Sequence, residues 1–229
     1  MLFVLGHIPI PQVVRRANVS DKSLHFLAYM LLAFMMWSAA KPPDTKVNWR
    51  RLTPWLVLLV AAGYGVCDEW LQFYVAGRST DMMDLAADFV GALASLVLLS
   101  LAPFWPALLI LTAVTIFSLT NFTRADLSRL LPAANMILHL AGYGFFAAAW
   151  LRYTTLVPPL RRTRTSRLLT ALVLPFGLLA AVKLGSVLFG RNVHESDIAL
   201  AAAAITAVLV AHSFVAWLRG LSGRISSTD

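Results

Sequence analysis

The chain has 229 residues, of which 59% are hydrophobic and 13% are charged, whereas about a quarter of the residues in a soluble domain carry charge. Its formal charge is +8, but the basic residues form short clusters between long apolar runs, which excludes a nucleic-acid-binding module, a coiled coil and a disordered tail. The single cysteine, Cys67, excludes an intramolecular disulfide and a CxxC metal site, and we expect it to be a small core residue of an integral membrane protein.

The predicted spans begin after a short apolar start. As a helix, residues 1–10 would reach about 15 Å, half of the roughly 30 Å core of a bilayer. Seven later stretches are long and apolar enough to cross a membrane. They are Ser23–Ala40, Leu52–Ala76, Met82–Ala102, Pro103–Thr123, Leu130–Leu151, Leu168–Gly190 and Asp197–Leu218. Pro103 and Pro106 place a tight turn between the third and fourth. The sequence predicts an all-α, polytopic transmembrane helix bundle of about seven spans.

The basic residues predict the orientation. One side of the predicted bundle carries eleven Lys and Arg residues and the other carries seven. The richer side should be cytoplasmic. We therefore expect loops 41–51 and 152–167 and the C-terminus in the cytoplasm.

Several residues recur in the same order 113 or 114 positions later. His25 and Tyr29 recur as His139 and Tyr143, Trp37 as Trp150, Gly77-Arg78 as Gly190-Arg191, and Asp84 as Asp197. This pattern predicts two degenerate parallel repeats, 1–102 and 103–229. Met1 then falls opposite residues 114–115, so we expect that the start lies further upstream or that the first span is vestigial.

The second copy has lost most of the ionisable residues of the first. Asn135 replaces Asp21, and Ala181, Val182 and Ala201 replace Asp68, Glu69 and Asp88. If the protein has one functional site, the first copy should form it.

Polar residues follow one face at the outer end of each of the first three spans. The stripes are Asp21, His25 and Tyr29; Asp68, Glu69 and Gln72; and Asp81, Asp84 and Asp88. Ionisable side chains within spans normally face the bundle interior or a watery cavity. We expect an acidic pocket that opens outward, with Lys22 and Arg78 at its rim.

These residues differ in how strongly they indicate function. Asp21, Lys22 and Asp81 also suit the start of a helix, where an acidic residue caps the chain and complements the dipole. Tyr29 and Gln72 also suit packing or supporting contacts. The deeper acidic residues and His25 favour function, because an ionisable group within a span is costly.

The order of these motifs resembles that of the VanZ-like family of bacterial membrane proteins. The resemblance rests on Asp21-Lys22-x-x-His25-Phe26-x-x-Tyr29, Asp68-Glu69-x-x-Gln72, Gly77-Arg78 and Asp84-Leu85-Ala86-Ala87-Asp88-x-x-Gly91. It covers about residues 20–102. The chain departs from the family at Asp88, where asparagine is usual, and in a first span represented only by residues 1–10. The resemblance implies an envelope-associated protein, and the founding member of the family is linked to low-level teicoplanin resistance.

Three functions fit this pattern. The first is an envelope protein whose pocket binds a lipid headgroup or a glycopeptide-related ligand, with a role in antibiotic resistance. The second is an enzyme acting on a lipid-linked phosphate or sugar, in which carboxylates hold a divalent cation, His25 or Glu69 acts as general acid or base, and Arg78 binds phosphate. The third is a proton- or cation-coupled transporter. No motif identifies a cofactor or a catalytic residue, so enzyme status stays open. The expected partners are membrane lipids, including a lipid-linked envelope precursor, and not nucleic acid.

Overall fold

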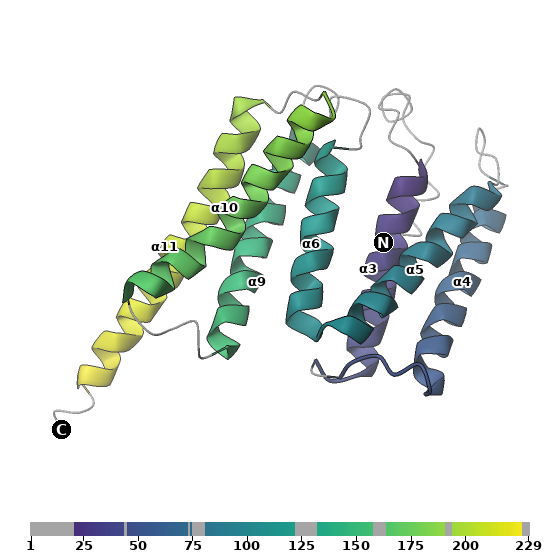
Figure 1. Cartoon of the computed structure of the whole chain (residues 1–229), viewed down its shortest axis with the longest axis horizontal. Coiled ribbons are helices and arrows are strands. Elements are labelled where there is room, and N and C mark those ends of the chain that lie inside the picture. The colour runs from purple at the N-terminus through teal and green to yellow at the C-terminus, as the bar shows by residue number, and fades with distance from the viewer. Residues whose placement is uncertain are drawn as a thin grey trace. The chain divides into compact units, whose positions relative to one another are not determined.

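The computed structural model describes residues 21–43, 45–72, 74, 81–121, 132–157, 164–190 and 194–225. These residues form helices and connecting turns, with no strand among them. The helices are α3 (Asp21–Ala40), α4 (Leu52–Gln72), α5 (Met82–Leu101), α6 (Phe104–Asn121), α8 (Pro132–Ile137), the π-helical turn η1 (Leu138–Gly142), α9 (Tyr143–Leu156), α10 (Arg164–Leu188) and α11 (Glu195–Ile225) (Figure 1). The chain divides into two compact units, Met1–Leu130 and Leu131–Asp229.

Seven segments of the described chain are long and apolar enough to cross a membrane. Six are single helices, and the seventh runs through α8, η1 and α9 from Pro132 to Leu156. The predicted all-α bundle of seven spans is therefore confirmed. The ends differ by a few residues, as where α4 stops at Gln72 and not at Ala76. The two-repeat division at residues 102 and 103 stays a prediction.

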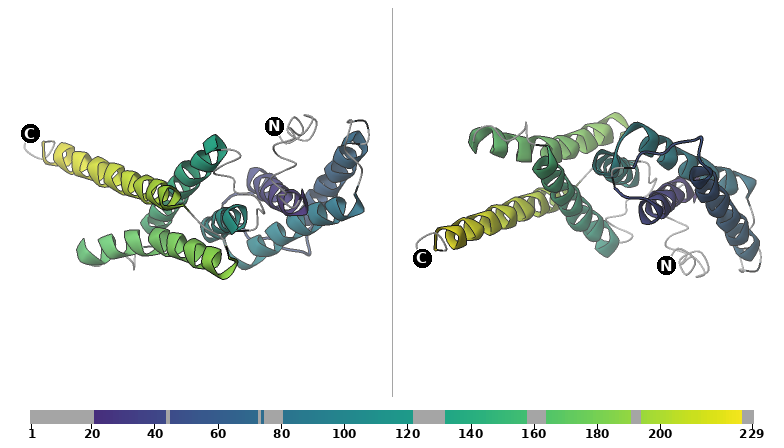
Figure 2. Two further views of the ribbon diagram at one scale, coloured as in Figure 1. Left: turned by 90° about the horizontal axis from the view of Figure 1, so that it is seen from above. Right: turned by 90° about the horizontal axis from the view of Figure 1, so that it is seen from below.

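In the first unit, α5 lies obliquely against α3 and also packs on α4 (Figures 1 and 2). The core between these helices is apolar and includes Tyr29, Phe34, Ala61 and Leu96. Gly91 makes the α3–α5 contact close. A Cβ atom at this position would lie 2.2 Å from the Phe26 carbonyl oxygen. Small residues of this kind let helix backbones approach within membranes.

At the end of this unit where α5 finishes and α6 begins, the connecting segments hold the helices together. Ala102 ends α5, Pro103 follows, and α6 begins at Phe104, so the predicted turn is confirmed. Pro106 falls in the first turn of α6, where its missing N–H is not needed. The Val47 N–H donates to the Leu99 carbonyl at 3.1 Å, and the Phe104 N–H donates to the Pro43 carbonyl at 3.2 Å. These bonds fix the register of the 41–51 segment against the end of α5.

In the second unit, α9 packs against both α10 and α11. Asn135 on α8 donates from Nδ2 to Asp197 Oδ1 on α11 at 2.8 Å, and both side chains are buried. His139 Nδ1 bonds the Asn135 carbonyl oxygen at 2.9 Å, beside the start of the π-helical turn. The start of α8 and the start of α11 are thus joined by a polar side-chain contact.

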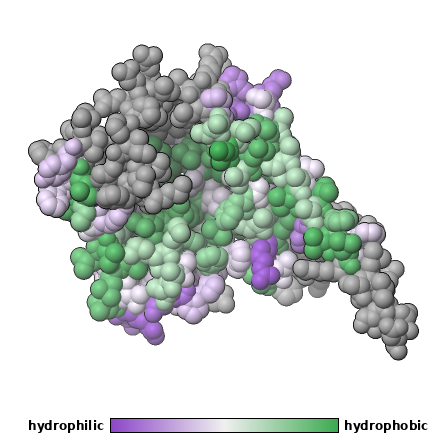
Figure 3. Space-filling view, turned by 180° about the vertical axis from the view of Figure 1, so that it is seen from behind, coloured by the Kyte–Doolittle hydropathy of each residue, from purple (hydrophilic) through white to green (hydrophobic). Residues whose placement is uncertain are grey.

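Large apolar side chains cover much of the helix surface that would face lipid. Leu59, Met82, Val173 and Val210 are exposed, and Figure 3 shows hydrophobic residues predominating over the described part of the visible face. Contiguous apolar surface of this extent is unusual in a soluble monomer. It is the surface that a bilayer would cover.

Candidate functional site

The acidic cluster, defined as Lys22, His25, Glu69, Asp81, Asp84 and Asp88, lies where α3 begins, α4 ends and α5 begins. Asp81 is the N-cap of α5 and accepts the Met83 N–H at 2.8 Å. The spacing of three and then four residues puts Asp84 and Asp88 on one face of α5. Both side chains are buried, and Asp88 is 0% exposed.

Lys22 joins α3 to two of these carboxylates. Its Nζ forms an ion pair with Asp81 and another with Asp84 Oδ1 at 3.2 Å. The Lys22 ammonium, together with the Met83 N–H, holds the pKa of Asp81 below its ordinary value. Asp81 therefore stays ionised at neutral pH, both as a helix cap and as a partner of Lys22.

His25 joins the same two helices one turn deeper. Its Nδ1 lies 2.8 Å from Asp88 Oδ1. When Asp88 is ionised, its oxygens can only accept, so Nδ1 then donates and the contact holds the imidazole in one tautomer. The second oxygen of Asp88, Oδ2, is buried and has no hydrogen-bond partner within the described residues.

Gly65 on α4 makes room for that oxygen. A Cβ atom at Gly65 would lie 2.9 Å from Asp88 Oδ2 and 3.2 Å from Leu85 Cδ1. A larger residue at 65 would displace Asp88 from His25. Gly65 was not among the predicted site residues, and the only indication of it in the sequence is a small residue near the polar end of a span.

Glu69 brings α4 into the acidic cluster. Its Oε2 accepts the Asp81 N–H at 3.0 Å, which satisfies one of the backbone donors at the start of α5. Its Oε1 is buried and accepts no hydrogen bond within the part of the chain that the structure describes. Ligand atoms of His25, Glu69 and Asp84 all lie within 4.8 Å of one another.

Carboxyl groups outnumber cationic groups in the acidic cluster. Four carboxyl side chains face one lysine and one histidine, and three of the four carboxyl groups are buried. Burying a charge is costly unless it is paired. This arrangement therefore favours a ligand that carries positive charge.

The other predicted site residues are not part of the acidic cluster. Tyr29 packs in the core with its ring centroid 6.1 Å from that of Tyr64, and Asp68 is buried on α4. Arg78 and the side chains of Asp21 and Gln72 lie outside what the structure describes. Cys67 is exposed on α4, so its prediction as a core residue is wrong. An apolar position in a span can face lipid as easily as the core.

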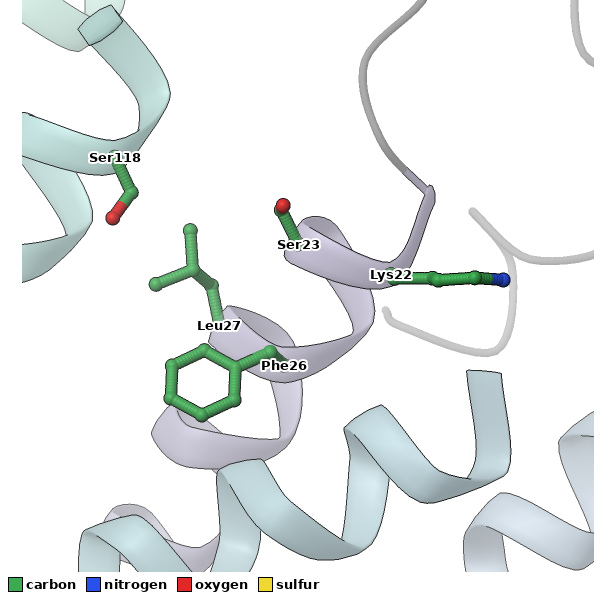
Figure 4. A pocket seen from close by; sticks show the side chains of 5 residues that line it. All are labelled: Lys22, Ser23, Phe26, Leu27 and Ser118. Atoms are coloured by element: carbon green, nitrogen blue, oxygen red, sulfur yellow. The ribbon is translucent and has the colours of Figure 1, made fainter. Parts of the chain in front are cut away.

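A cavity of about 290 Å³ lies beside the start of α3, lined by Lys22, Ser23, Phe26, Leu27 and Ser118. In Figure 4 the side chains of Ser23 and Leu27 extend on the side of Ser118, whereas the Lys22 ammonium points away from them. That ammonium binds Asp81 and Asp84. The carboxylates of the acidic cluster do not line this cavity, so it is distinct from the predicted acidic pocket.

The second unit has a different polar contact at the positions that the predicted repeat pairs with the acidic cluster. Asp197, paired with Asp84 in that prediction, accepts a hydrogen bond from Asn135. His139, paired with His25, bonds the Asn135 carbonyl of its own helix segment, and residue 201, paired with Asp88, is alanine. The described part of the second unit thus has a polar helix contact without a comparable group of carboxylates.

Residues 5–103 match the VanZ/LLP1 family model. This segment contains α3, α4 and α5, and with them the whole acidic cluster. The predicted resemblance to the VanZ-like family is confirmed over residues 5–103, and the described residues include seven segments long and apolar enough to span a bilayer. No curated protein and no solved structure matches the chain.

Proposed function

We propose that this VanZ-like protein lies in the inner membrane of a bacterial cell and binds the headgroup of an envelope lipid at the acidic cluster, from the outer side. One observation carries the proposal: buried carboxylates of α4 and α5 meet Lys22 and His25 of α3 at one end of the first unit, and among the described residues of the acidic cluster the carboxyl groups outnumber the cationic groups. That end corresponds to the depth of lipid headgroups, because Lys22, Glu69 and Asp84 all lie within a few residues of a span terminus.

The charge of the acidic cluster specifies the kind of headgroup. A primary ammonium can donate several hydrogen bonds to carboxylates, whereas a headgroup with only negative charge would be repelled. We therefore favour an amine-bearing phospholipid. A glycopeptide-related ligand would have to present a cationic group in the same way, and the resistance role that the family implies would follow from that binding.

Replacing Glu69 with glutamine should weaken the retention of an amine-bearing lipid. The full chain, reconstituted in nanodiscs with equal amounts of phosphatidylethanolamine and phosphatidylglycerol, is extracted into detergent, and retained lipid is measured by native mass spectrometry. We expect the native chain to retain phosphatidylethanolamine and Glu69→Gln to retain at least tenfold less of it. A tenfold change in affinity corresponds to about 1.4 kcal/mol of binding free energy.

The matched control is Glu195→Gln, which removes an exposed acidic residue of the second unit and should retain lipid normally. Equal retention of both lipids, or equal retention by Glu69→Gln, would contradict headgroup binding at the acidic cluster. Teicoplanin added to the same preparation separates the two ligand classes: displacement of lipid by teicoplanin would indicate the glycopeptide-related ligand.

The proposed orientation places position 46 in the cytoplasm and position 82 outside. Lys46 and Met82 are both exposed, so each can be replaced with cysteine in a Cys67→Ser background. We expect an impermeant thiol reagent to label Met82→Cys in intact cells, and Lys46→Cys only after permeabilisation. Labelling of position 46 in intact cells would reverse the orientation and place the acidic cluster on the cytoplasmic side.

A further inference from the structure

Three side chains of the acidic cluster lie close enough together to hold a metal ion. His25, Glu69 and Asp84 come from α3, α4 and α5, and their ligand atoms lie within 4.8 Å of one another. One imidazole nitrogen and two carboxylate oxygens suit divalent first-row transition metals such as Zn²⁺ or Mn²⁺. Ca²⁺ and Mg²⁺ prefer oxygen ligands alone.

Glu69 gives an independent indication that a cation is bound. Its side chain is 7% exposed, and Oε1 accepts no hydrogen bond within the described residues, although Oε2 accepts the Asp81 N–H. A buried acceptor without a partner costs about 1–3 kcal/mol, and more when it is charged. A cation held between Glu69, His25 and Asp84 would satisfy that oxygen.

The contact with Asp88 favours the His25 tautomer that can bind a metal through Nε2. His25 Nδ1 lies 2.8 Å from Asp88 Oδ1, and when an ionised Asp88 accepts from Nδ1, the lone pair of the imidazole is on Nε2. Metal-binding histidines are commonly oriented by a carboxylate on their other nitrogen in this way. The same pairing has no equivalent in the second unit, where the corresponding residue is Ala201.

We propose that His25, Glu69 and Asp84 bind one divalent transition-metal ion, and that Asp88 is a positioning residue for His25. This inference goes beyond headgroup binding, because the site needs no lipid. With metal–ligand bonds of about 2.1 Å, the ligand atoms of a tetrahedral site lie about 3.4 Å apart. From the present limit of 4.8 Å, the side chains need to close by at most about 1.4 Å.

Lys22 competes with the metal for Asp84. Its Nζ lies 3.2 Å from Asp84 Oδ1 and is also paired with Asp81. When a cation binds Asp84, Lys22 keeps Asp81 as its partner. Removing the ammonium should therefore strengthen metal binding, a gain that a folding defect would not produce.

The test is a Co²⁺ titration of the purified full chain in detergent, after treatment with a chelator and without added lipid. Visible absorption reports Co²⁺ binding directly, and Zn²⁺ and Mg²⁺ are added as competitors. We expect one Co²⁺ per chain, displaced by Zn²⁺ and not by equal Mg²⁺. Glu69→Gln and Asp84→Asn should each bind at least tenfold more weakly, and Asp88→Asn about 10–100-fold more weakly. Lys22→Met should bind several-fold more tightly.

Two substitutions in the second unit, His139→Gln and Asp197→Asn, serve as matched controls and should leave the titration unchanged. Circular dichroism and gel filtration establish that each variant is folded. The proposal is overturned if the native chain binds no Co²⁺, if Glu69→Gln and Asp84→Asn titrate like the native chain, or if Lys22→Met weakens binding. Because the headgroup and the metal would both use Glu69 and Asp84, retained lipid is removed before the titration and its removal is checked by native mass spectrometry. A failed titration of the lipid-free chain then overturns metal binding alone, and a failed lipid-retention experiment overturns headgroup binding alone.

Discussion

Replacing Gly91 with alanine is expected to destabilise the first unit severely. The added Cβ would lie 2.2 Å from the Phe26 carbonyl oxygen, 3.0 Å from the Phe26 carbonyl carbon and 3.1 Å from its Cα. Ordinary Cα–H···O contacts between helices have C···O distances of about 3.3–3.6 Å, so α3 and α5 must separate by about 1 Å. Overpacking typically costs about 1–3 kcal/mol, and a clash with backbone belongs at or above the upper end of that range.

The matched control is Gly63→Ala on α4, where a Cβ atom would meet nothing within 4 Å. Alanine there should leave the thermal midpoint unchanged or slightly higher, because it favours helix more than glycine does. The measurement is the thermal unfolding midpoint of each variant in one detergent, with the yield of monodisperse protein. A Gly91→Ala midpoint equal to that of Gly63→Ala would contradict the close α3–α5 contact.

Replacing Asp84 with asparagine should abolish function, whereas the same substitution at Asp197 should mainly lower stability. Asp84 binds Lys22 and lies among the carboxylates of the acidic cluster. Asp197 accepts one hydrogen bond from Asn135 and has no such group around it within the described residues. Asparagine at 197 can still accept that bond, so we expect a loss of about 1 kcal/mol from the weaker, uncharged contact.

This pair is compared by lipid retention per mole of folded protein and by thermal midpoint. Asp84→Asn should lose at least tenfold in retention at normal membrane abundance, and Asp197→Asn should retain lipid with a lower midpoint. Equal loss of retention in both variants, independent of abundance, would mean that both units contribute to binding. Full retention in Asp84→Asn would limit this carboxylate to a structural role.

The helical architecture could be predicted because the bilayer imposes a length and an apolar composition on each span. The meeting of the three polar stripes was also predictable, since His25, Glu69 and Asp88 are too costly to face lipid. The hydrogen-bond and ion-pair partners of the polar residues could not be predicted. The spacing of residues gives no indication that Glu69 accepts the Asp81 N–H or that Lys22 bridges two aspartates, because these contacts depend on how the helices cross.

Apolar positions were harder to place than polar ones. Lipid and protein core are both apolar, so the sequence cannot assign Cys67 to either, and the structure places it on the exposed side of α4. The π-helical turn at Leu138–Gly142 was also not predicted. It contains no proline, and it lies beside the bond from His139 to the Asn135 carbonyl, a contact that only the folded chain shows.

The central claim is that the acidic cluster of the first unit binds an amine-bearing headgroup. Photocrosslinking tests it most directly, with a phosphatidylethanolamine analogue that carries a photoreactive group next to its amine, in vesicles containing the full chain. After proteolysis, we expect crosslinked peptides from the start of α3, the end of α4 and the start of α5, and their loss in Glu69→Gln but not in Glu195→Gln. Crosslinks confined to α8–α11, or an unchanged pattern in Glu69→Gln, would contradict the account.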